Sequence, residues 1–202
     1  MLDITELIVA SGNQGKVTEI REILRPLNIV VRSLKDIWDP IPDIDEPGDT
    51  FEENARIKAQ WVFAKTGMCS LADDSGLEVD ALNGEPGVRS ARYCGTHGAD
   101  TENNNLLLCN LSNIPSEQRT ARFRCVIVLV TPSGEYIHAD GICEGMIGFT
   151  PEGTNGFGYD PLFTPLGYMA TFAQLDSSIK HTLSHRGKAL AELVKQLRER
   201  IT

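Results

Sequence analysis

The spacing of apolar residues changes repeatedly along this chain, and that change constrains the fold more than any other feature. The run Leu7–Ala10 predicts a short buried strand, and the turn residues Ser11–Asn13 follow it. Apolar residues then recur at helical spacing from Val17 to Leu27. A strand followed at once by an amphipathic helix is a building unit of α/β proteins.

The alternation of the two spacings continues to the end of the chain. Further strands are expected at 29–34, 70–72, 122–131 and 136–145, and further helices at 51–64, 102–111 and 188–200. Thr50 and Glu53 have the spacing of a capping box at the start of the second helix. The residues Pro132–Gly134 indicate a hairpin between the last two strands. The expected fold class is α/β with a mixed central sheet.

Composition and charge narrow the function classes. The chain has 202 residues, which is one ordinary domain, and a net charge of −9. That charge argues against binding along nucleic acid, which needs clustered basic residues. The start of the chain lacks the basic segment of a signal peptide, and the longest apolar run, Val126–Val130, is too short to span a membrane. Five scattered cysteines without a CxxC pair fit a reducing cytoplasm, where we expect the protein to reside.

The turn after the first strand is a candidate phosphate site. It reads Ser11, Gly12, Asn13, Gln14, Gly15 and Lys16 and leads into the first helix. Free backbone N–H groups and the positive end of a helix dipole suit phosphate, and Lys16 adds a positive charge. The spacing is not that of a Walker A loop, because Val17 stands where a Ser or Thr would hold magnesium. A plain turn with a surface lysine remains the alternative.

A set of acidic residues is a candidate metal site. Its members are Glu46, Glu52, Glu53, Asp73 and Asp74, and the last two are expected at the end of a strand that turns at Ser75-Gly76. Adjacent carboxylates are costly unless a positive charge compensates them. Magnesium bound by one or two carboxylates and by substrate phosphates would compensate them. An Asx-turn with one solvated carboxylate remains the alternative.

Two later segments combine aromatic, basic and glycine residues. Gly156–Pro161 offers aromatic rings for stacking and a carboxylate, Asp160, that can accept hydrogen bonds from a base. Ser184–Lys188, preceded by Lys180, gathers hydrogen-bond donors just before the last helix. An aromatic-anchored turn and a solvated helix start are the structural alternatives.

The five segments taken together resemble the inosine-triphosphatase family of purine nucleotide pyrophosphatases. The matching segments, in the family's order, are SGNQGK, PGDTFEENARIKA, LADDSGLEVDALNGEPGVRSARYCG, TNGFGYDPLF and LSHRGKAL. They span nearly the whole chain. Two departures are visible: Ser11 replaces the usual Thr and keeps its hydroxyl, and Pro47 replaces Thr ahead of the second segment, which stiffens the loop after Glu46.

The resemblance implies an activity and a set of residues that carry it. Family members hydrolyse the α–β phosphoanhydride of ITP, dITP and XTP, which clears these noncanonical nucleotides before they enter DNA and RNA. By similarity, the loop from Ser11 to Lys16 holds the triphosphate together with Lys58. Glu46 and Asp74 look like ligands of Mg²⁺, for which Mn²⁺ can substitute, with Asp73 as a further candidate ligand. Asp74 is also the implied general base.

The resemblance also implies where the substrate base binds. Ser75 is expected to touch substrate. The remaining implied base-pocket residues come from the two later segments: Phe157, Gly158, Tyr159, Asp160, Lys180, His185 and Arg186. Phe157 or Tyr159 would stack on the purine, and His185 and Arg186 would donate to its 6-oxo group. Adenine carries an amino group there and would leave these donors unpaired, so the site is expected to reject ATP.

The implied architecture is a single pyrophosphatase domain over residues 1–202. It is expected to be elongated, with two lobes around the sheet, the active site in the cleft between them, and a homodimeric assembly. The expected partners are purine nucleoside triphosphates, without nucleic acid or membrane. Three rival interpretations are a Maf-type pyrophosphatase, a catalytically silent nucleotide binder and a scaffold protein. The FGYDP and SHRGK segments oppose the first, the carboxylates with Lys16 and Lys58 oppose the second, and the lack of heptads or repeats opposes the third.

Overall fold

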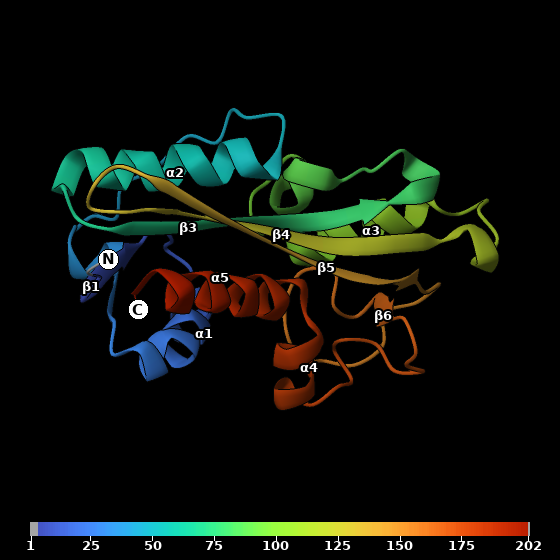
Figure 1. The fold of residues 1–202 in the computed structure, drawn as a ribbon. Helices are drawn as coiled ribbons and strands as arrows, with labels where there is room; N and C mark the ends of the chain where they lie inside the picture. Colours follow the sequence, from blue (N-terminus) through green and yellow to red (C-terminus); the bar gives the residue numbers. More distant parts are fainter. Residues whose placement is uncertain (1–3, 202) are drawn as a thin grey trace. The chain divides into compact units, whose positions relative to one another are not determined.

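A six-stranded sheet with the strand order β2-β1-β3-β4-β5-β6 organises the chain, as the computed structural model of residues 4–201 shows (Figure 1). β1 pairs in parallel with β2 and with β3, whereas β5 and β6 are antiparallel. The sheet is therefore mixed, and the predicted α/β class is confirmed. The strands are β1 (Glu6–Val9), β2 (Val30–Ser33), β3 (Ser70–Val79), β4 (Thr120–Val130), β5 (Tyr136–Ile147) and β6 (Phe163–Pro165).

Residues 4–201 also form five α-helices, of which the first three alternate with strands and the last two follow β6. They are α1 (Gln14–Leu24), α2 (Phe51–Thr66), α3 (Asp100–Asn110), α4 (Ser177–Leu183) and α5 (His185–Ile201). The predicted capping box of α2 is present, because the Thr50 side chain accepts from Glu53 N and Glu53 reaches back to the Thr50 N–H. No helix within residues 4–201 has both the length and the apolar composition that crossing a bilayer requires.

The chain divides into two compact units, which we describe separately. Unit 1 comprises Met1–Asp74, Val126–Asp140 and Ala189–Thr202, and unit 2 comprises Ser75–Cys125 and Gly141–Lys188. In unit 1, α2 and the final helix lie on opposite sides of β3 (Figure 1). The Ser70 hydroxyl donates to the Ala59 carbonyl oxygen at 2.7 Å and fastens β3 to α2.

Parallel pairing sets the position of the residues that follow β1. Val9 lies opposite Leu71, and Ala10 N donates to the Leu71 carbonyl oxygen at 2.7 Å. Parallel strands run in the same direction, so the turn after Val9 and the residues after Leu71 extend toward the same end of the strand pair. The candidate phosphate loop, Ser11–Lys16, therefore lies beside the middle of β3.

Unit 2 has its own apolar core. It consists of side chains from the second halves of β3 and β5, the first half of β4, helix α3 and the segment around β6. Phe123, Phe163 and Phe172 form an aromatic centre, with the rings of Phe123 and Phe163 4.7 Å apart edge to face. Tyr159 belongs to the same core. The loop of the FGYD segment is therefore built directly on packed side chains.

The prediction of a turn at Ser75-Gly76 is wrong. β3 continues as a single strand from Ser70 to Val79, and Asp73 and Asp74 lie in its middle. The side chains beyond the expected turn are buried: Leu77 packs in the core of unit 2, and its N–H donates to Ser90 Oγ at 2.9 Å. Tertiary packing therefore outweighs the turn preference of the Ser-Gly pair.

Three smaller differences concern the second half of the chain. No helix was predicted within 83–95, where the structure has the 3-10 helix Gly87–Arg92, and the sequence pattern did not predict β6 or α4. The last helix begins at His185 rather than Lys188, so Arg186 lies in its first turn rather than before it. The remaining predicted strands and helices are confirmed with end shifts of a few residues, and the short connection 131–135 forms the hairpin between β4 and β5.

Candidate functional site

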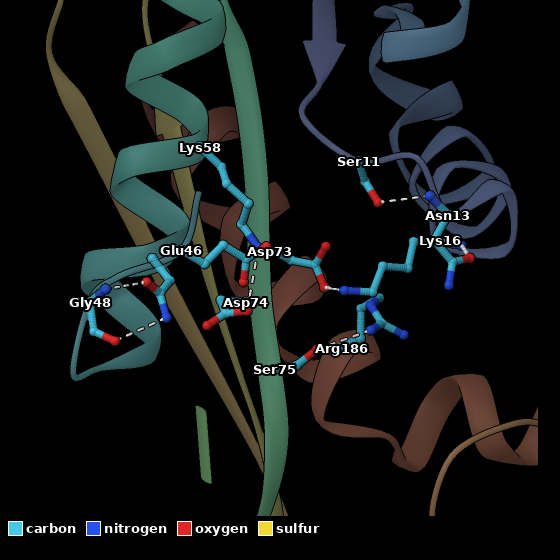
Figure 2. Close-up of polar contacts among 11 residues, drawn as sticks. Ser11, Asn13, Lys16, Glu46, Gly48, Lys58, Asp73, Asp74, Ser75 and Arg186 are labelled. Atoms are coloured by element: carbon cyan, nitrogen blue, oxygen red, sulfur yellow. Dashed lines mark hydrogen bonds and ion pairs between the residues drawn. The ribbon is translucent and has the colours of Figure 1, made fainter. Parts of the chain in front are cut away.

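The loop between β1 and α1 is shaped by its own side chains. Asn13 caps α1 by accepting from Lys16 N at 3.2 Å, and the Ser11 hydroxyl accepts from Asn13 N at 3.1 Å (Figure 2). The residues from Gly12 to Gly15 are exposed. The start of α1 therefore presents backbone N–H groups and the positive end of a helix dipole to solvent, as an anion site requires.

Lys16 connects this loop to β3. Its ammonium group lies 2.9 Å from Asp73 Oδ2. The side chain of Asp73 is fully buried, whereas that of Lys16 keeps 18% of its surface exposed. A buried carboxylate is tolerated when a cation compensates it, and the partly exposed ammonium group remains within reach of a second anion.

Lys58 on α2 joins two of the predicted metal ligands. Its Nζ lies 3.1 Å from Glu46 Oε1 and 3.3 Å from Asp74 Oδ1 (Figure 2). Burial lowers the pKa of Lys58, but the carboxylates of Asp74 and Glu46 outweigh that effect and raise it, so the lysine stays charged. Burial raises the pKa of Asp74, against the opposing charge of Lys58. A carboxyl with a raised pKa is suited to take up a proton.

The loop that carries Glu46 is held by the first turn of α2. The buried side chain of Asn54 accepts from Gly48 N at 2.7 Å and donates back to Gly48 O at 3.3 Å. A Cβ on Gly48 would come within 2.7 Å of Asn54 Oδ1, so this grip requires glycine. Glu53 adds a bond to Asp49 N at 2.9 Å. Glu46 thus lies two residues before a glycine whose backbone N–H and C=O are both hydrogen-bonded.

The donor set fits a divalent cation that is shared with substrate. Asp74 Oδ2 is buried and has no hydrogen-bond partner among the described residues, which is costly for a carboxylate oxygen. Glu46 and Asp74 converge on one lysine and offer hard oxygen ligands. Within residues 4–201, no group of three or more His, Cys, Asp and Glu side chains is arranged to hold a metal ion. A hard cation held here would take its other ligands from phosphate oxygens or water.

In unit 2, the FGYD loop is built around an ion pair. The ammonium group of Lys180 and the N–H of Phe157 both donate to Asp160 Oδ2, the latter at 2.8 Å. Burial raises the pKa of Asp160, and the charge of Lys180 opposes that rise. Gly156 has a φ of +78°, and a Cβ there would overlap the Asp160 carboxylate. Glycine at this position therefore permits the close approach of the pair.

The two aromatic residues of this loop have different environments. Phe157 is 54% exposed, and Lys180 Nζ lies 5.2 Å from its ring centroid. Tyr159 is only 4% exposed, and its hydroxyl donates to the Ser90 carbonyl oxygen at 2.9 Å. Of the two candidates for stacking on a base, Phe157 presents an open ring, whereas Tyr159 anchors the loop.

The start of α5 supplies the other donors of unit 2. Arg186 Nη2 donates to Ser75 Oγ at 3.2 Å (Figure 2). His185 stacks on Phe123 with ring centroids 4.9 Å apart and an interplanar angle of 12°. Both side chains are buried, and a buried guanidinium has donors in a rigid fork that match a carbonyl oxygen.

The predicted site residues thus fall into two groups, each held together within one unit. The first group, in unit 1, comprises the loop Ser11–Lys16 with Glu46, Lys58, Asp73 and Asp74. The second, in unit 2, comprises Ser75, the segment 157–160, Lys180, His185 and Arg186.

Sequence reasoning missed the residues that hold these groups in place. Asn54 grips the Glu46 loop, and Ser90 receives the Tyr159 hydroxyl. Asp100 and Asn104 on α3 bind the two polar groups of Gly158. Asn54 and Ser90 lie within segments that match the family, whereas Asp100 and Asn104 lie outside all five segments.

Comparison with known proteins shows relatives over nearly the whole chain. The model of the Ham1 family matches residues 7–196. A protein of Exiguobacterium sibiricum named dITP/XTP pyrophosphatase is 50% identical over 93% of this chain and 94% of its own length.

Solved structures give the same result for the fold. The structure of a HAM1 protein from Coxiella burnetii matches with a TM-score of 0.89 and 42% identity, covering 98% of this chain and all of that one. The structure of a nucleoside-triphosphatase, also named dITP/XTP pyrophosphatase, from Mycobacterium abscessus matches with a TM-score of 0.79 and 46% identity over 93% and 98% of the two chains. The resemblance that the five sequence segments indicated is therefore confirmed.

Proposed function

The chain belongs to the Ham1 family, and on this premise we propose that it hydrolyses dITP, XTP and ITP to the monophosphate and pyrophosphate. Relatives named dITP/XTP pyrophosphatase support the substrate class. The observation that carries the proposal is the placement of Lys58 between Glu46 and Asp74, because the lysine offers a positive charge to phosphate and the two carboxylates offer oxygen ligands to a cation. The activity removes altered purines from the nucleotide pool before polymerases use them.

The residues of unit 1 would act on the triphosphate. The exposed N–H groups at the start of α1, with Lys16 and Lys58, neutralise phosphate charge. Asp74 accepts the proton of the attacking water, the water oxygen bonds to the α-phosphorus, and the bond from that phosphorus to the bridging oxygen breaks. Pyrophosphate leaves with the bonding electrons. Positioning and charge neutralisation account for most of the catalysis in reactions of this kind.

We propose Mg²⁺ as the cofactor, with Mn²⁺ as a substitute. Glu46 and Asp74 would hold it, with Asp73 close by and already paired to Lys16. When bound, the ion supplies charge neutralisation at the phosphate oxygens and acidifies water. The buried Asp74 Oδ2 supports this assignment, because a cation gives that oxygen a partner.

The residues of unit 2 would read the base. Phe157 stacks on the purine, and Arg186 and His185 donate to its 6-oxo group. Adenine has an amino group at that position, so these buried donors would lose their acceptor and ATP would be rejected. Asp160 would accept from donors on the base with the acceptor capacity that Lys180 and the Phe157 N–H leave unused.

Pyrophosphate release tests the proposal directly. Purified protein is mixed in turn with ITP, dITP, XTP, ATP and GTP, with Mg²⁺ and with EDTA. We expect release from the first three with Mg²⁺, little from ATP, and none from any of them with EDTA. A catalytically silent binder would bind ITP in calorimetry and release no pyrophosphate, and that result would overturn the proposal.

Assembly and location complete the proposal. We propose a homodimer in the cytoplasm, as the family resemblance implies, and the five cysteines are present as thiols, which fits a reducing compartment. Light scattering on the eluted protein would give twice the mass of the chain for a dimer, and the mass of one chain would contradict the assembly.

A further inference from the structure

Helix α3 binds both backbone polar groups of Gly158 in the FGYD loop, and we call these two hydrogen bonds the grip. Asp100 Oδ2 accepts from Gly158 N at 2.7 Å, and Asn104 Nδ2 donates to Gly158 O at 3.0 Å. Asp100 and Asn104 are four residues apart, so they lie on the same side of the helix. The hydrogen bond to the Asp100 carboxylate is charge-assisted, which makes it stronger than a hydrogen bond between two neutral groups.

The grip falls at the point where the loop changes direction. Gly158 has a φ of +60°, in the left-handed region, and its neighbours face different environments. Tyr159 is buried in the core of unit 2, whereas Phe157 is more than half exposed. Whatever holds the Gly158 peptide therefore decides where the ring of Phe157 stands.

The backbone of Phe157 is fixed on both flanks. Its own N–H donates to Asp160 at 2.8 Å, and the peptide that follows is held by α3. The side of the grip that faces the core is closely packed, because Asn104 is buried, and Leu107 of α3 and Leu111 just after the helix belong to the same core as Tyr159. Neither Asp100 nor Asn104 needs to touch a nucleotide to influence this ring.

We infer that Asp100 and Asn104 are positioning residues for base recognition, holding Phe157 at the place where its ring stacks on the purine. The inference rests on the proposed function of Phe157. It assigns to α3 a role in substrate affinity that is separate from the phosphate and metal chemistry of unit 1. Loss of the grip should therefore raise KM for ITP and leave kcat nearly unchanged.

Steady-state kinetics on Asp100→Ala provide the first test. We expect KM for ITP to rise about tenfold, as for the loss of a hydrogen bond to a charged group, with kcat within about twofold of wild type. Asp100→Asn keeps an acceptor for the Gly158 N–H and should restore most of the affinity. Asn105→Ala is the matched control, because Asn105 is the exposed neighbour of Asn104 on the same helix.

A double-mutant cycle with Phe157 separates positioning from general support of the fold. If Asp100 acts through the ring, Asp100→Ala should raise KM in the wild-type background and change it little in a Phe157→Ala background. Equal increases in the two backgrounds, or a fall in kcat at unchanged KM, would overturn the inference. If Asp100→Ala does not fold, as judged by circular dichroism, Asn104→Ala and Asp100→Asn are compared in the same cycle.

A binding measurement distinguishes failure of this inference from failure of the proposed function. If the wild type releases no pyrophosphate from ITP, the proposed activity is wrong, and calorimetric titration with ITP then tests positioning alone. Weaker binding by Asp100→Ala than by Asn105→Ala would support the inference. Equal affinity of the two variants, or no binding by either, would overturn it.

Discussion

In unit 1 the candidate site carries three carboxylates (Glu46, Asp73 and Asp74) and two lysines, whereas in unit 2 it carries one carboxylate with Lys180 and Arg186. The excess of negative charge in unit 1 favours a cation that arrives with the substrate. The excess of positive charge in unit 2 favours oxygen acceptors on a neutral base. The charges in unit 1 therefore suit phosphate with a cation, and those in unit 2 suit a neutral ring that carries oxygen acceptors.

The same comparison extends to how each candidate loop is held. In unit 1 the buried side chain of Asn54 binds both backbone polar groups of Gly48, two residues after Glu46. In unit 2 two side chains, Asp100 and Asn104, divide that task at Gly158, near the exposed ring. In both units a helix thus holds a loop through side-chain hydrogen bonds to the backbone of a glycine.

Asp74→Asn should have the largest effect, confined to the chemistry of unit 1. The variant loses a proton acceptor and a charged metal ligand, so kcat for ITP should fall about a thousandfold or more. Recognition of the base by unit 2 should survive, and ITP should still bind in calorimetry. Asp43→Asn, at an exposed position, is the control. Pyrophosphate release at the wild-type rate from Asp74→Asn would refute the assignment.

Lys58→Met should destabilise the protein, because the substitution increases the excess of negative charge in unit 1. Removing the ammonium group leaves Glu46 and Asp74 without their shared cation, which should lower the free energy of unfolding by about 3 kcal/mol. Urea denaturation without metal measures this loss. Added Mg²⁺ should restore more stability to this variant than to wild type.

The exposed Lys65 on the same helix provides the control for that measurement. Lys65→Met should cost no more than about 1 kcal/mol, as expected for a surface cation. If both lysine variants lose the same stability, the carboxylates of unit 1 do not depend on Lys58 in the way that the contacts indicate.

Arg186→Ala should alter the choice of base and spare the hydrolytic step. Loss of the guanidinium donors should narrow the ratio of kcat/KM for ITP over ATP about tenfold to a hundredfold. A competition assay, in which both nucleotides are present in the same reaction, gives this ratio. Arg200→Ala, near the exposed end of the same helix, is the control. If the ratio of kcat/KM for ITP over ATP is unchanged in Arg186→Ala, Arg186 does not select for the 6-oxo group.

Local sequence signals were sufficient wherever the structure itself is local. The strand-turn-helix at Ser11–Lys16 and the capping box at Thr50 and Glu53 depend on neighbours within a few residues, and both are confirmed. The turn expected at Ser75-Gly76 failed because buried contacts from distant segments keep β3 extended there. Local propensity could not register those contacts.

The candidate site divides in the same way. The sequence motifs contain the charged residues of unit 1. In the structure these residues form ion pairs, Lys16 with Asp73 and Lys58 with Glu46 and Asp74. The pattern could not distinguish Phe157 from Tyr159 as the open ring, because burial is a tertiary property. Nor could it identify Asn104, since its bond reaches a residue far along the chain.

Gly156→Ala should have the smallest effect, and it tests whether close packing around Asp160 shapes the candidate site of unit 2. Gly156 and Gly134 both have positive φ, +78° and +84°, but only at Gly156 would a Cβ overlap another group, the Asp160 carboxylate. Gly134→Ala, with nothing within 4 Å, measures the cost of the backbone conformation alone, about 1 kcal/mol. Gly156→Ala should cost about 1 kcal/mol more, and KM for ITP should rise because Asp160 and Lys180 must move apart.

Thermal unfolding and ITP kinetics on the two alanine variants give the comparison. An equal loss of stability in both, with KM unchanged in Gly156→Ala, would mean that Asp160 relaxes without consequence and that the ion pair does not shape the base site. A larger loss at Gly156, accompanied by weaker ITP binding, would show that unit 2 depends on close packing where unit 1 depends on charge balance.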